Sequence, residues 1–249
     1  MNEKPFEDLA SYYDLIYKDK NYTQEADFIE ECIRPYFKVE KILELGCGTG
    51  NYTEIFFDRG YKITGIDISA RMLEVARKKC PCSFLKNDIR NFRLPDKFDC
   101  CLALFAVMGY LTDNSDIAKV LKNIRSHLAN GGLFIFDVWN GLAVMRNLPE
   151  DRIKEMENDE YKIVRFAHPT LKALDHVCEV DYKLVIQKKK ANQLSEINEK
   201  HSVRFFFPKE LEYYLEIAGF EVLRICPFLD FNGKVDENVW NMTVIAKAV

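Results

Sequence analysis

The sequence predicts an α/β protein with a parallel, doubly wound sheet and an antiparallel insert. Three observations lead to this prediction. Short apolar runs alternate with segments of helical periodicity between residues 41 and 138. A glycine-rich turn at residues 46–50 follows the first apolar run and precedes a helical segment. After Asn140 apolar residues recur at alternate positions, which is typical of antiparallel strands with one exposed face.

Each element of the parallel sheet has its own signal. Strands are expected where apolar runs are bounded by polar or turn residues, at 41–45, 61–66, 82–86, 98–105 and 133–138. Helices are expected where apolar residues recur at helical spacing, at 22–36, 51–59, 69–79 and 115–128. Ser69 is the expected N-cap of the third helix, and Gly131-Gly132 turns the chain into the fifth strand.

The second half of the chain has three β-prone runs, at 161–166, 176–187 and 201–207, with a hairpin loop at 188–195. Pro208 begins a helix that Gly219 ends, and strands are expected at 220–226 and 239–246. The simplest organisation is one Rossmann-like domain, made of residues 1–140 with an N-terminal helical lid and of residues 207–249. Residues 141–206 form the antiparallel insert, a cap over the carboxyl ends of the strands, where such sheets bind ligands.

Composition and charge narrow the class of partner. The 249 residues carry a net charge of −4, and the pI is about 5.7. This balance disfavours nucleic acid and anionic membranes as partners. No apolar run is long enough to cross a bilayer, and residues 1–10 lack the apolar stretch of a signal peptide, so we expect a cytoplasmic protein.

Eight cysteines raise the question of metal or redox chemistry. Cys80-Pro81-Cys82 and Cys100-Cys101 are the two close pairs, and neither has the C-x-x-C spacing of a zinc ribbon or a thioredoxin motif. We therefore expect reduced thiols packed as small hydrophobic side chains, and no metal site.

The glycine-rich turn predicts a nucleotide cofactor, because glycines let a ligand approach the backbone and leave the first helix amides free to face it. Asp67 ends the second apolar strand, where a carboxylate can accept both hydroxyls of a ribose. Asp88 follows the third strand, where a carboxylate can accept from the N6 amine of adenine. The G-x-G-x-G spacing differs from the dinucleotide fingerprint, and the missing lysine excludes a Walker A loop.

In combination these motifs resemble the class I S-adenosylmethionine-dependent methyltransferases. Residues 44–50 resemble motif I of that family, residues 66–73 its second motif, and Asn87-Asp88 its third. The resemblance covers about residues 38–140, with a Gly219-Phe220 junction before the last strands. It implies a seven-stranded sheet whose last strand, 239–246, is antiparallel. It also implies S-adenosyl-L-methionine as the cofactor and S-adenosyl-L-homocysteine as its product.

The resemblance assigns roles to the cofactor site. Gly46 and Gly48 would border the methionine part of the cofactor, Asp67 the ribose and Asp88 the adenine. Glu44 is interpreted as an anchor near the methionine amino group, or alternatively as a cap for the amides of the turn. The other residues expected to contact the cofactor are Tyr13, Cys47, Ile68, Met72, Asn87, Ile89 and Phe105, the last of which could equally be plain core.

A narrower resemblance links the N-terminus, from Tyr13 to Ala26, to the sugar-nucleotide N,N-dimethyltransferases of antibiotic amino-sugar pathways. Residues 105–111 and the segment His201-x-x-Arg204-Phe205-Phe206 also look like their pattern. It implies methyl transfer to an N or O atom of a small-molecule acceptor, such as an amino-sugar nucleotide, under the insert.

The expected acceptor-side residues each have an alternative role. His201 and Tyr17 are the candidate catalytic groups, and Tyr17, Tyr110, Trp139 and Arg204 the candidate acceptor contacts. The alternatives are a structural histidine, packing tyrosines (Tyr22 among them), a packing tryptophan at the hinge of the cap, and an ion pair between Arg204 and an insert carboxylate. Because the sulfonium methyl is already activated, alignment supplies much of the catalysis and a strong base is optional for an amine.

Two other function classes compete with this prediction. One is an NAD-dependent oxidoreductase, which the glycine spacing disfavours. The other is a non-catalytic module that binds S-adenosylmethionine and serves a protein partner. The expected assembly is a monomer or a homodimer.

Overall fold

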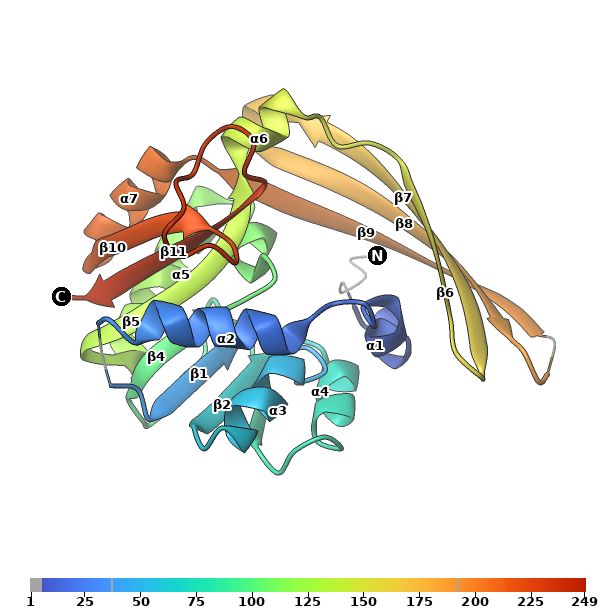
Figure 1. The fold of residues 1–249 in the computed structure, drawn as a ribbon, viewed down its shortest axis with the longest axis horizontal. Helices are drawn as coiled ribbons and strands as arrows, with labels where there is room; N and C mark the ends of the chain where they lie inside the picture. The colour runs from blue at the N-terminus through green and yellow to red at the C-terminus, as the bar shows by residue number, and fades with distance from the viewer. Residues whose placement is uncertain (1–5, 37, 192) are drawn as a thin grey trace.

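The computed structural model describes residues 6–36, 38–191 and 193–249. The apolar runs of the first half form the parallel strands β1 (Lys41–Leu45), β2 (Lys62–Asp67), β3 (Ser83–Lys86), β4 (Phe98–Ala103) and β5 (Leu128–Asn140). They lie in the order β3-β2-β1-β4-β5 (Figure 1). β11 (Asn241–Ala248) pairs antiparallel with β5 and with β10 (Phe220–Pro227). The predicted Rossmann-like sheet with an antiparallel last strand is confirmed.

Helices cover both faces of this sheet because each buries one apolar stripe. On one face, α2 (Tyr22–Ile33) and α3 (Asn51–Asp58) pack with Ile42 and Leu102 of the sheet. On the other, α5 (Asn114–His127) and α7 (Pro208–Ile217) pack with Phe134 and Phe136, whose rings stack at 4.5 Å. The short helix α4 (Ala70–Ala76) has Ser69 as its N-cap, as predicted, and the Ser69 side chain accepts a hydrogen bond from the Met72 amide.

Several strand boundaries differ from the sequence prediction. In the insert, the strands predicted at 161–166 and 201–207 extend over Tyr161–Lys172 and Gln193–Phe206, so residues 188 and 193–195 of the predicted hairpin loop belong to strands.

Two boundaries in the central sheet differ for backbone reasons. β5 begins at Leu128 instead of residue 133, because Gly131 (φ +79°) and Gly132 sit in an irregularity of the β4–β5 pairing. A Cβ on Gly132 would lie 2.9 Å from the Ala129 carbonyl oxygen, so a glycine is needed there. β4 ends at Ala103, because the chain turns into a left-handed conformation at Phe105 and Ala106 (φ +66° and +57°).

The insert is an antiparallel meander of four strands, not three (Figure 1). After α6 (Gly141–Arg146) come β6 (Arg152–Glu157), β7 (Tyr161–Lys172), η3 (Ala173–Asp175), β8 (Val177–Lys188) and β9 (Gln193–Phe206). The sequence prediction missed β6 because this edge strand is mostly polar and exposed. The end of β9 pairs in parallel with Trp139 and Asn140 of β5, so the insert joins the central sheet through hydrogen bonds.

The N-terminal segment lies against the insert. It consists of η1 (Leu9–Ser11) and α1 (Tyr13–Ile16). Leu9 and Ile16 are buried in a hydrophobic cluster with Met156, Ile163 and Leu184 of the insert strands. Figure 1 shows α1 between the start of α2 and β6. The segment therefore bridges the central domain and the insert.

The prediction that all cysteines are reduced is wrong for one pair. Cys80 and Cys82 form a disulfide across Pro81, with their Cα atoms 5.4 Å apart. The remaining cysteines, Cys32, Cys47, Cys100, Cys101, Cys178 and Cys226, are free and buried. Across the described ranges, no helix combines the length and apolar character that a membrane crossing requires.

Candidate active site

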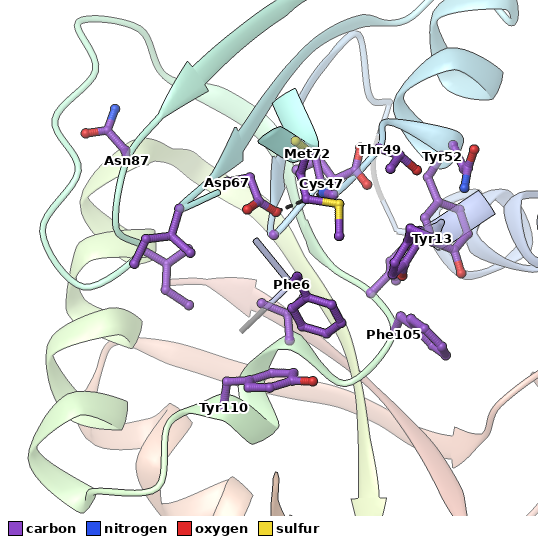
Figure 2. Close-up of a pocket in the computed structure, with 18 of the residues that line it drawn as sticks. Phe6, Tyr13, Cys47, Thr49, Tyr52, Asp67, Met72, Asn87, Phe105 and Tyr110 are labelled. Atoms are coloured by element: carbon purple, nitrogen blue, oxygen red, sulfur yellow. Dashed lines mark hydrogen bonds between the residues drawn. The ribbon is translucent and has the colours of Figure 1, made fainter. Parts of the chain in front are cut away.

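A cavity of about 300 Å³ lies where β1, β2 and β4 end, between the glycine-rich turn and the N-terminal segment (Figure 2). All of the residues expected to contact the cofactor line it. The full lining is Phe6, Tyr13, Tyr22, Glu44, Gly46, Cys47, Gly48, Thr49, Asn51, Tyr52, Asp67, Ile68, Met72, Asn87, Asp88, Ile89, Arg90, Leu104, Phe105, Val107, Tyr110 and Leu111.

The glycines of the turn serve two different purposes. Gly46 (φ +63°) packs against the η2 turn (Val107–Tyr110), and a Cβ there would lie 2.6 Å from Cγ2 of Val107. Gly48 (φ +53°) has open space around its missing Cβ, with no atom within 4 Å. The first glycine therefore allows close packing inside the protein, and the second leaves bare backbone facing the cavity.

Asp67 is tied to the same turn. Its Oδ2 accepts the Gly48 amide at 2.9 Å, and its Oδ1 accepts the Ser69 amide at 2.8 Å. Burial raises the pKa of the carboxyl, although the two backbone hydrogen bonds oppose that rise. Each carboxylate oxygen keeps a further lone pair, so Asp67 can still accept hydroxyl groups from a ligand in the cavity.

Arg90 already binds the carboxylate of Asp88, which was expected to accept the N6 amine of adenine. The guanidinium of Arg90 contacts both carboxylate oxygens, with Nε 3.0 Å from each and Nη2 2.6 Å from Oδ2, and this holds the pKa of Asp88 below its usual value. Asp88 would therefore accept from an adenine amine with its remaining lone pairs. Ile68, Ile89 and Leu111 supply apolar walls of the same cavity.

Glu44 is buried at the floor of the cavity. Its Oε2 accepts the hydroxyl of Thr53 in α3, so the carboxyl does not cap the amides of the turn, which was the alternative considered from the sequence. Burial, with a smaller contribution from Asp67, raises the pKa of Glu44 to about 8. A cationic ligand in the cavity would find an acidic group here that is neutral in its absence.

Asp137 organises the turn after β4, and sequence reasoning missed it. Its carboxylate accepts the amides of Phe105 at 2.5 Å and Ala106 at 3.0 Å, which fixes their left-handed backbone and presents the Phe105 ring to the cavity. Burial raises the pKa of Asp137 to about 6. An acidic residue inside the apolar run 133–138 was the available signal.

The N-terminal part of the chain, from Phe6 to Tyr22, contributes aromatic side chains to the cavity, and Phe6 was not anticipated from the sequence. This part, hereafter the lid, is the one predicted to act as a lid. The Phe6 ring meets those of Tyr13 and Tyr110 edge-on, with centroids 6.0 Å and 5.6 Å away (Figure 2). Tyr22 also lines the cavity and packs edge-on against Tyr52 at 5.1 Å. These rings close one side of the cavity.

Tyr110 connects the cavity to a buried pair in β9. Its hydroxyl lies 2.8 Å from Nδ1 of His201, and Nε2 of His201 lies 2.9 Å from Oε2 of Glu199. His201 itself is 2% exposed and does not line the cavity, so it has no direct access to an acceptor. Burial raises the pKa of Tyr110 well above its usual value, so this phenol is protonated at neutral pH.

Three of the expected acceptor contacts lie outside the cavity lining. Tyr17 packs on Tyr13 and Phe105, at centroid distances of 4.7 and 5.0 Å, behind the cavity wall, and burial raises its pKa to about 12. Trp139 packs edge-on against Trp240 at 5.5 Å, which agrees with the packing alternative.

Arg204 does not point to an acceptor. It is buried, forms an ion pair with Glu210 of α7, and donates to the Thr112 carbonyl at 3.0 Å and to Asn114 Oδ1 at 2.7 Å. Through these contacts the guanidinium joins β9 to α7 and to the start of α5. The ion pair expected as the alternative is present, but its carboxylate belongs to α7 and not to the insert.

Comparison with known proteins adds three findings. Residues 42–132 match a family described as methyltransferase domain. The chain is 27% identical over 221 residues to dTDP-3-amino-3,4,6-trideoxy-alpha-D-glucopyranose N,N-dimethyltransferase of Streptomyces venezuelae, covering 86% of this chain and 91% of that protein. It is 26% identical over 226 residues to the putative methyltransferase YqeM of Bacillus subtilis, covering 88% of each.

The fold also matches a solved structure. An S-adenosylmethionine-dependent methyltransferase from Clostridium acetobutylicum superposes with a TM-score of 0.82 at 24% identity, covering 95% of this chain and 96% of that chain. Because 95% of this chain is covered, the match includes most of the insert as well as the central sheet.

Proposed function

We propose that this chain, which belongs to the class I S-adenosylmethionine-dependent methyltransferases, methylates an amino nitrogen of a sugar-nucleotide acceptor. The family makes the protein an enzyme, with S-adenosyl-L-methionine as its cofactor. The alternative of an NAD-dependent oxidoreductase finds no support, because the relatives named above are methyltransferases.

The residues of the cavity fit the cofactor. Open backbone at Gly48, acceptor oxygens at Asp67 and apolar walls at Ile68 and Ile89 suit a methionine chain, a ribose and an adenine in turn. When bound, the sulfonium supplies an activated methyl group. The chain's own contribution is to orient the cofactor, to exclude water with the lid, and to hold the acceptor nitrogen in line. The face of the Tyr13 ring can also attract the sulfonium charge.

The proposal of an amine acceptor rests on the aromatic end of the cavity. Phe6, Tyr13, Phe105 and Tyr110 line it from the lid and the β4 turn, and these four residues offer phenols but no carboxylate, imidazole or amine. A neutral amine attacks without first losing a proton, whereas a hydroxyl needs a strong base in direct contact with it, so this lining favours an amine. The Streptomyces venezuelae relative, whose name specifies an amino-sugar nucleotide and two methyl groups, aligns over most of its length.

Several finer statements belong to the same proposal. We infer a small-molecule acceptor and not a nucleic acid, because acidic and basic residues are nearly balanced. A cytoplasmic location and a monomeric or homodimeric state remain predictions from the sequence. The insert would act as the cap over the acceptor.

The direct test is a methylation assay with purified protein, S-adenosylmethionine and matched dTDP-sugars. One sugar carries a 3-amino group and one carries a 4-amino group. The third carries hydroxyl groups at both of these positions. Mass spectrometry should show one or two added methyl groups on an amino sugar and none on the hydroxyl analogue. Methylation of the hydroxyl analogue, or of neither amino sugar, would refute the proposed acceptor, and Asp67→Ala serves as the control that cannot hold the cofactor well.

A further inference from the structure

A continuous hydrogen-bonded chain runs from the cavity to the lid through the insert. It begins at the Tyr110 hydroxyl, passes through both ring nitrogens of His201, and reaches Oε2 of Glu199. The same Oε2 accepts the amide of Phe6 at 2.9 Å, and Oε1 accepts the amide of Leu9 at 3.2 Å. The Glu199 carboxylate therefore holds the lid and orients the histidine at once.

The polarity of this chain follows from its donors and acceptors. Glu199 accepts two backbone amides, so its carboxylate is the acceptor toward His201, and Nε2 of the imidazole carries the hydrogen. Nδ1 is then an acceptor and takes the hydrogen of the Tyr110 hydroxyl. The lone pairs of the phenol oxygen are left available to a donor N–H in the cavity.

We propose that Tyr110, His201 and Glu199 form a proton relay that takes the proton from the methylated acceptor nitrogen, and that closure of the lid completes it. This inference rests on the proposed function, because it requires an amine acceptor. Tyr110 is the residue that touches the acceptor. His201 and Glu199 are positioning residues that act through it.

The transfer balances in atoms and electrons. The amine lone pair forms the new N–C bond while the S–C bond breaks and its electron pair stays on sulfur. The resulting ammonium gives a proton to the Tyr110 oxygen as Tyr110 gives its own to Nδ1 of His201. The imidazolium so formed lies beside the Glu199 carboxylate, and it loses its extra proton to solvent when the lid opens.

The surroundings of His201 explain why the proposed relay needs the lid. The Phe6 ring meets the imidazole edge-on at 4.6 Å, and Tyr182 of β8 covers it from another side at 5.0 Å. With the lid closed, these rings and Tyr110 shield the relay from water. With Phe6 and Leu9 displaced, Glu199 would lose both amide donors, and His201 would lose the cover of the Phe6 ring.

The relay matters most for a second methyl transfer. A nitrogen that has received one methyl is an ammonium without a lone pair, and it must lose a proton before it can attack again. An enzyme without the relay would release the monomethylated product, or wait for water to remove the proton. The ratio of dimethylated to monomethylated product therefore reports on the relay.

Two variants separate proton transfer from positioning. Tyr110→Phe removes the hydroxyl, and His201→Gln keeps one acceptor for Tyr110 and one donor for Glu199 but cannot take up a proton. We expect both to lower the product ratio about tenfold or more, with cofactor affinity unchanged. Tyr61→Phe, which loses a hydroxyl bonded to Glu30 at 3.0 Å outside the cavity, should leave the ratio unchanged. An unchanged ratio in His201→Gln would overturn the relay.

A measurement without acceptor tests the geometry independently of the proposed function. In ¹⁵N-histidine spectra, His201 should show hydrogen on Nε2 and an accepting Nδ1, and Tyr110→Phe should shift Nδ1. Glu199→Gln should speed amide exchange at Phe6 and Leu9, whereas Glu179→Gln, whose partners are Lys172 and Lys200, should not. A hydrogen on Nδ1, or no change in exchange, would refute the relay even if amino sugars are methylated. Failure of the sugars alone would refute only the acceptor.

Discussion

The carboxylate of Asp14 in the lid lies 2.8 Å from Nζ of Lys79, in the segment after α4. Its other oxygen accepts the hydroxyl of Thr49, in the glycine-rich turn, at 2.7 Å. Burial opposes the charge, but hydrogen bonds from Lys79 and Thr49 outweigh it and lower the pKa of Asp14. One acidic side chain thus joins the lid to the turn that faces the cavity.

Asp14→Ala should loosen the lid without unfolding the domain. We expect the dissociation constant for S-adenosylmethionine to rise roughly fivefold, about 1 kcal/mol, because the pair is partly exposed. Titration calorimetry measures this. Asp27→Ala breaks an ion pair with Arg59 away from the cavity and is the matched control. Equal effects in both variants would show that Asp14 acts on general stability only.

Asp67→Ala should weaken cofactor binding by about 1.5–3 kcal/mol, because it removes a charged acceptor. It also leaves the Gly48 and Ser69 amides without their partner, so the melting temperature should fall. Asp67→Asn keeps the shape and one acceptor oxygen, so its affinity for S-adenosylmethionine should lie between those of the wild type and Asp67→Ala. If calorimetry gave the wild-type affinity for Asp67→Ala, Asp67 would not belong to the cofactor site.

The buried Glu44 makes stability depend on pH. Its pKa is about 8 in the folded protein against 4.5 for an ordinary glutamate, so between these values the folded state holds more protons than the unfolded chain. The free energy of unfolding should therefore fall as pH rises from about 4.5 to 8, by on the order of a few kcal/mol. Urea unfolding at pH 5 and pH 8 measures the fall.

Glu44→Gln should remove most of this pH dependence. In this variant a smaller fall in the free energy of unfolding should persist as the pH rises toward 6, because burial raises the pKa of Asp137 to about 6. A variant as sensitive to pH as the wild type would mean that Glu44 is already ionised in the folded protein.

Cofactor binding should release a proton from Glu44 at neutral pH, because the positive charges of S-adenosylmethionine favour the carboxylate. Calorimetry in two buffers of different ionisation enthalpy should give up to about one proton released per cofactor bound at pH 7. S-adenosylhomocysteine, which lacks the sulfonium charge, should release less. Equal release by Glu44→Gln would assign the proton to another group.

The two glycines of the turn should respond differently to an added methyl group. Gly46→Ala should destabilise the fold, because its Cβ would collide with Val107, and Val107→Ala should partly restore it. Gly48→Ala meets no protein atom, so its cost to stability should be the backbone strain alone, about 1–2 kcal/mol. Its main effect should be on cofactor affinity, and unchanged affinity would show that the cofactor does not approach Gly48.

The central sheet could be predicted because its signals are local. Apolar runs, an N-cap at Ser69 and glycines at the turns each depend on a few neighbouring residues. β6 escaped prediction because an exposed edge strand needs no apolar pattern. The true start of β5 was also hidden, since Gly131-Gly132 normally indicates a turn and here forms an irregularity within a strand.

The site was predictable only where the sequence pattern followed from the sheet. Asp67, at the end of β2, could be placed in the cavity from its position alone. Glu199 could not, since its partners Phe6 and Leu9 are about 190 positions away in the chain. As its alternative role, Arg204 was expected to pair with a carboxylate of the insert, and its partner Glu210 lies instead in α7, which packs against it only in the folded chain. An acidic residue within the apolar run 133–138 marked Asp137 as unusual, but its partner amides at Phe105 and Ala106 follow from the tertiary fold.

The alternation of β9 restricts how this protein can diverge. Glu199, His201 and Phe205 are buried at alternate positions, whereas Lys200 between them is exposed. Inserting one residue between His201 and the β5 pairing at Phe205 would rotate Glu199 and His201 to the outer face. We therefore expect descendants of this sequence to keep that spacing while the ends of β8 and β9 far from the central sheet accumulate changes. The preference for one acceptor over another could then change while the relay of Tyr110, His201 and Glu199 is retained.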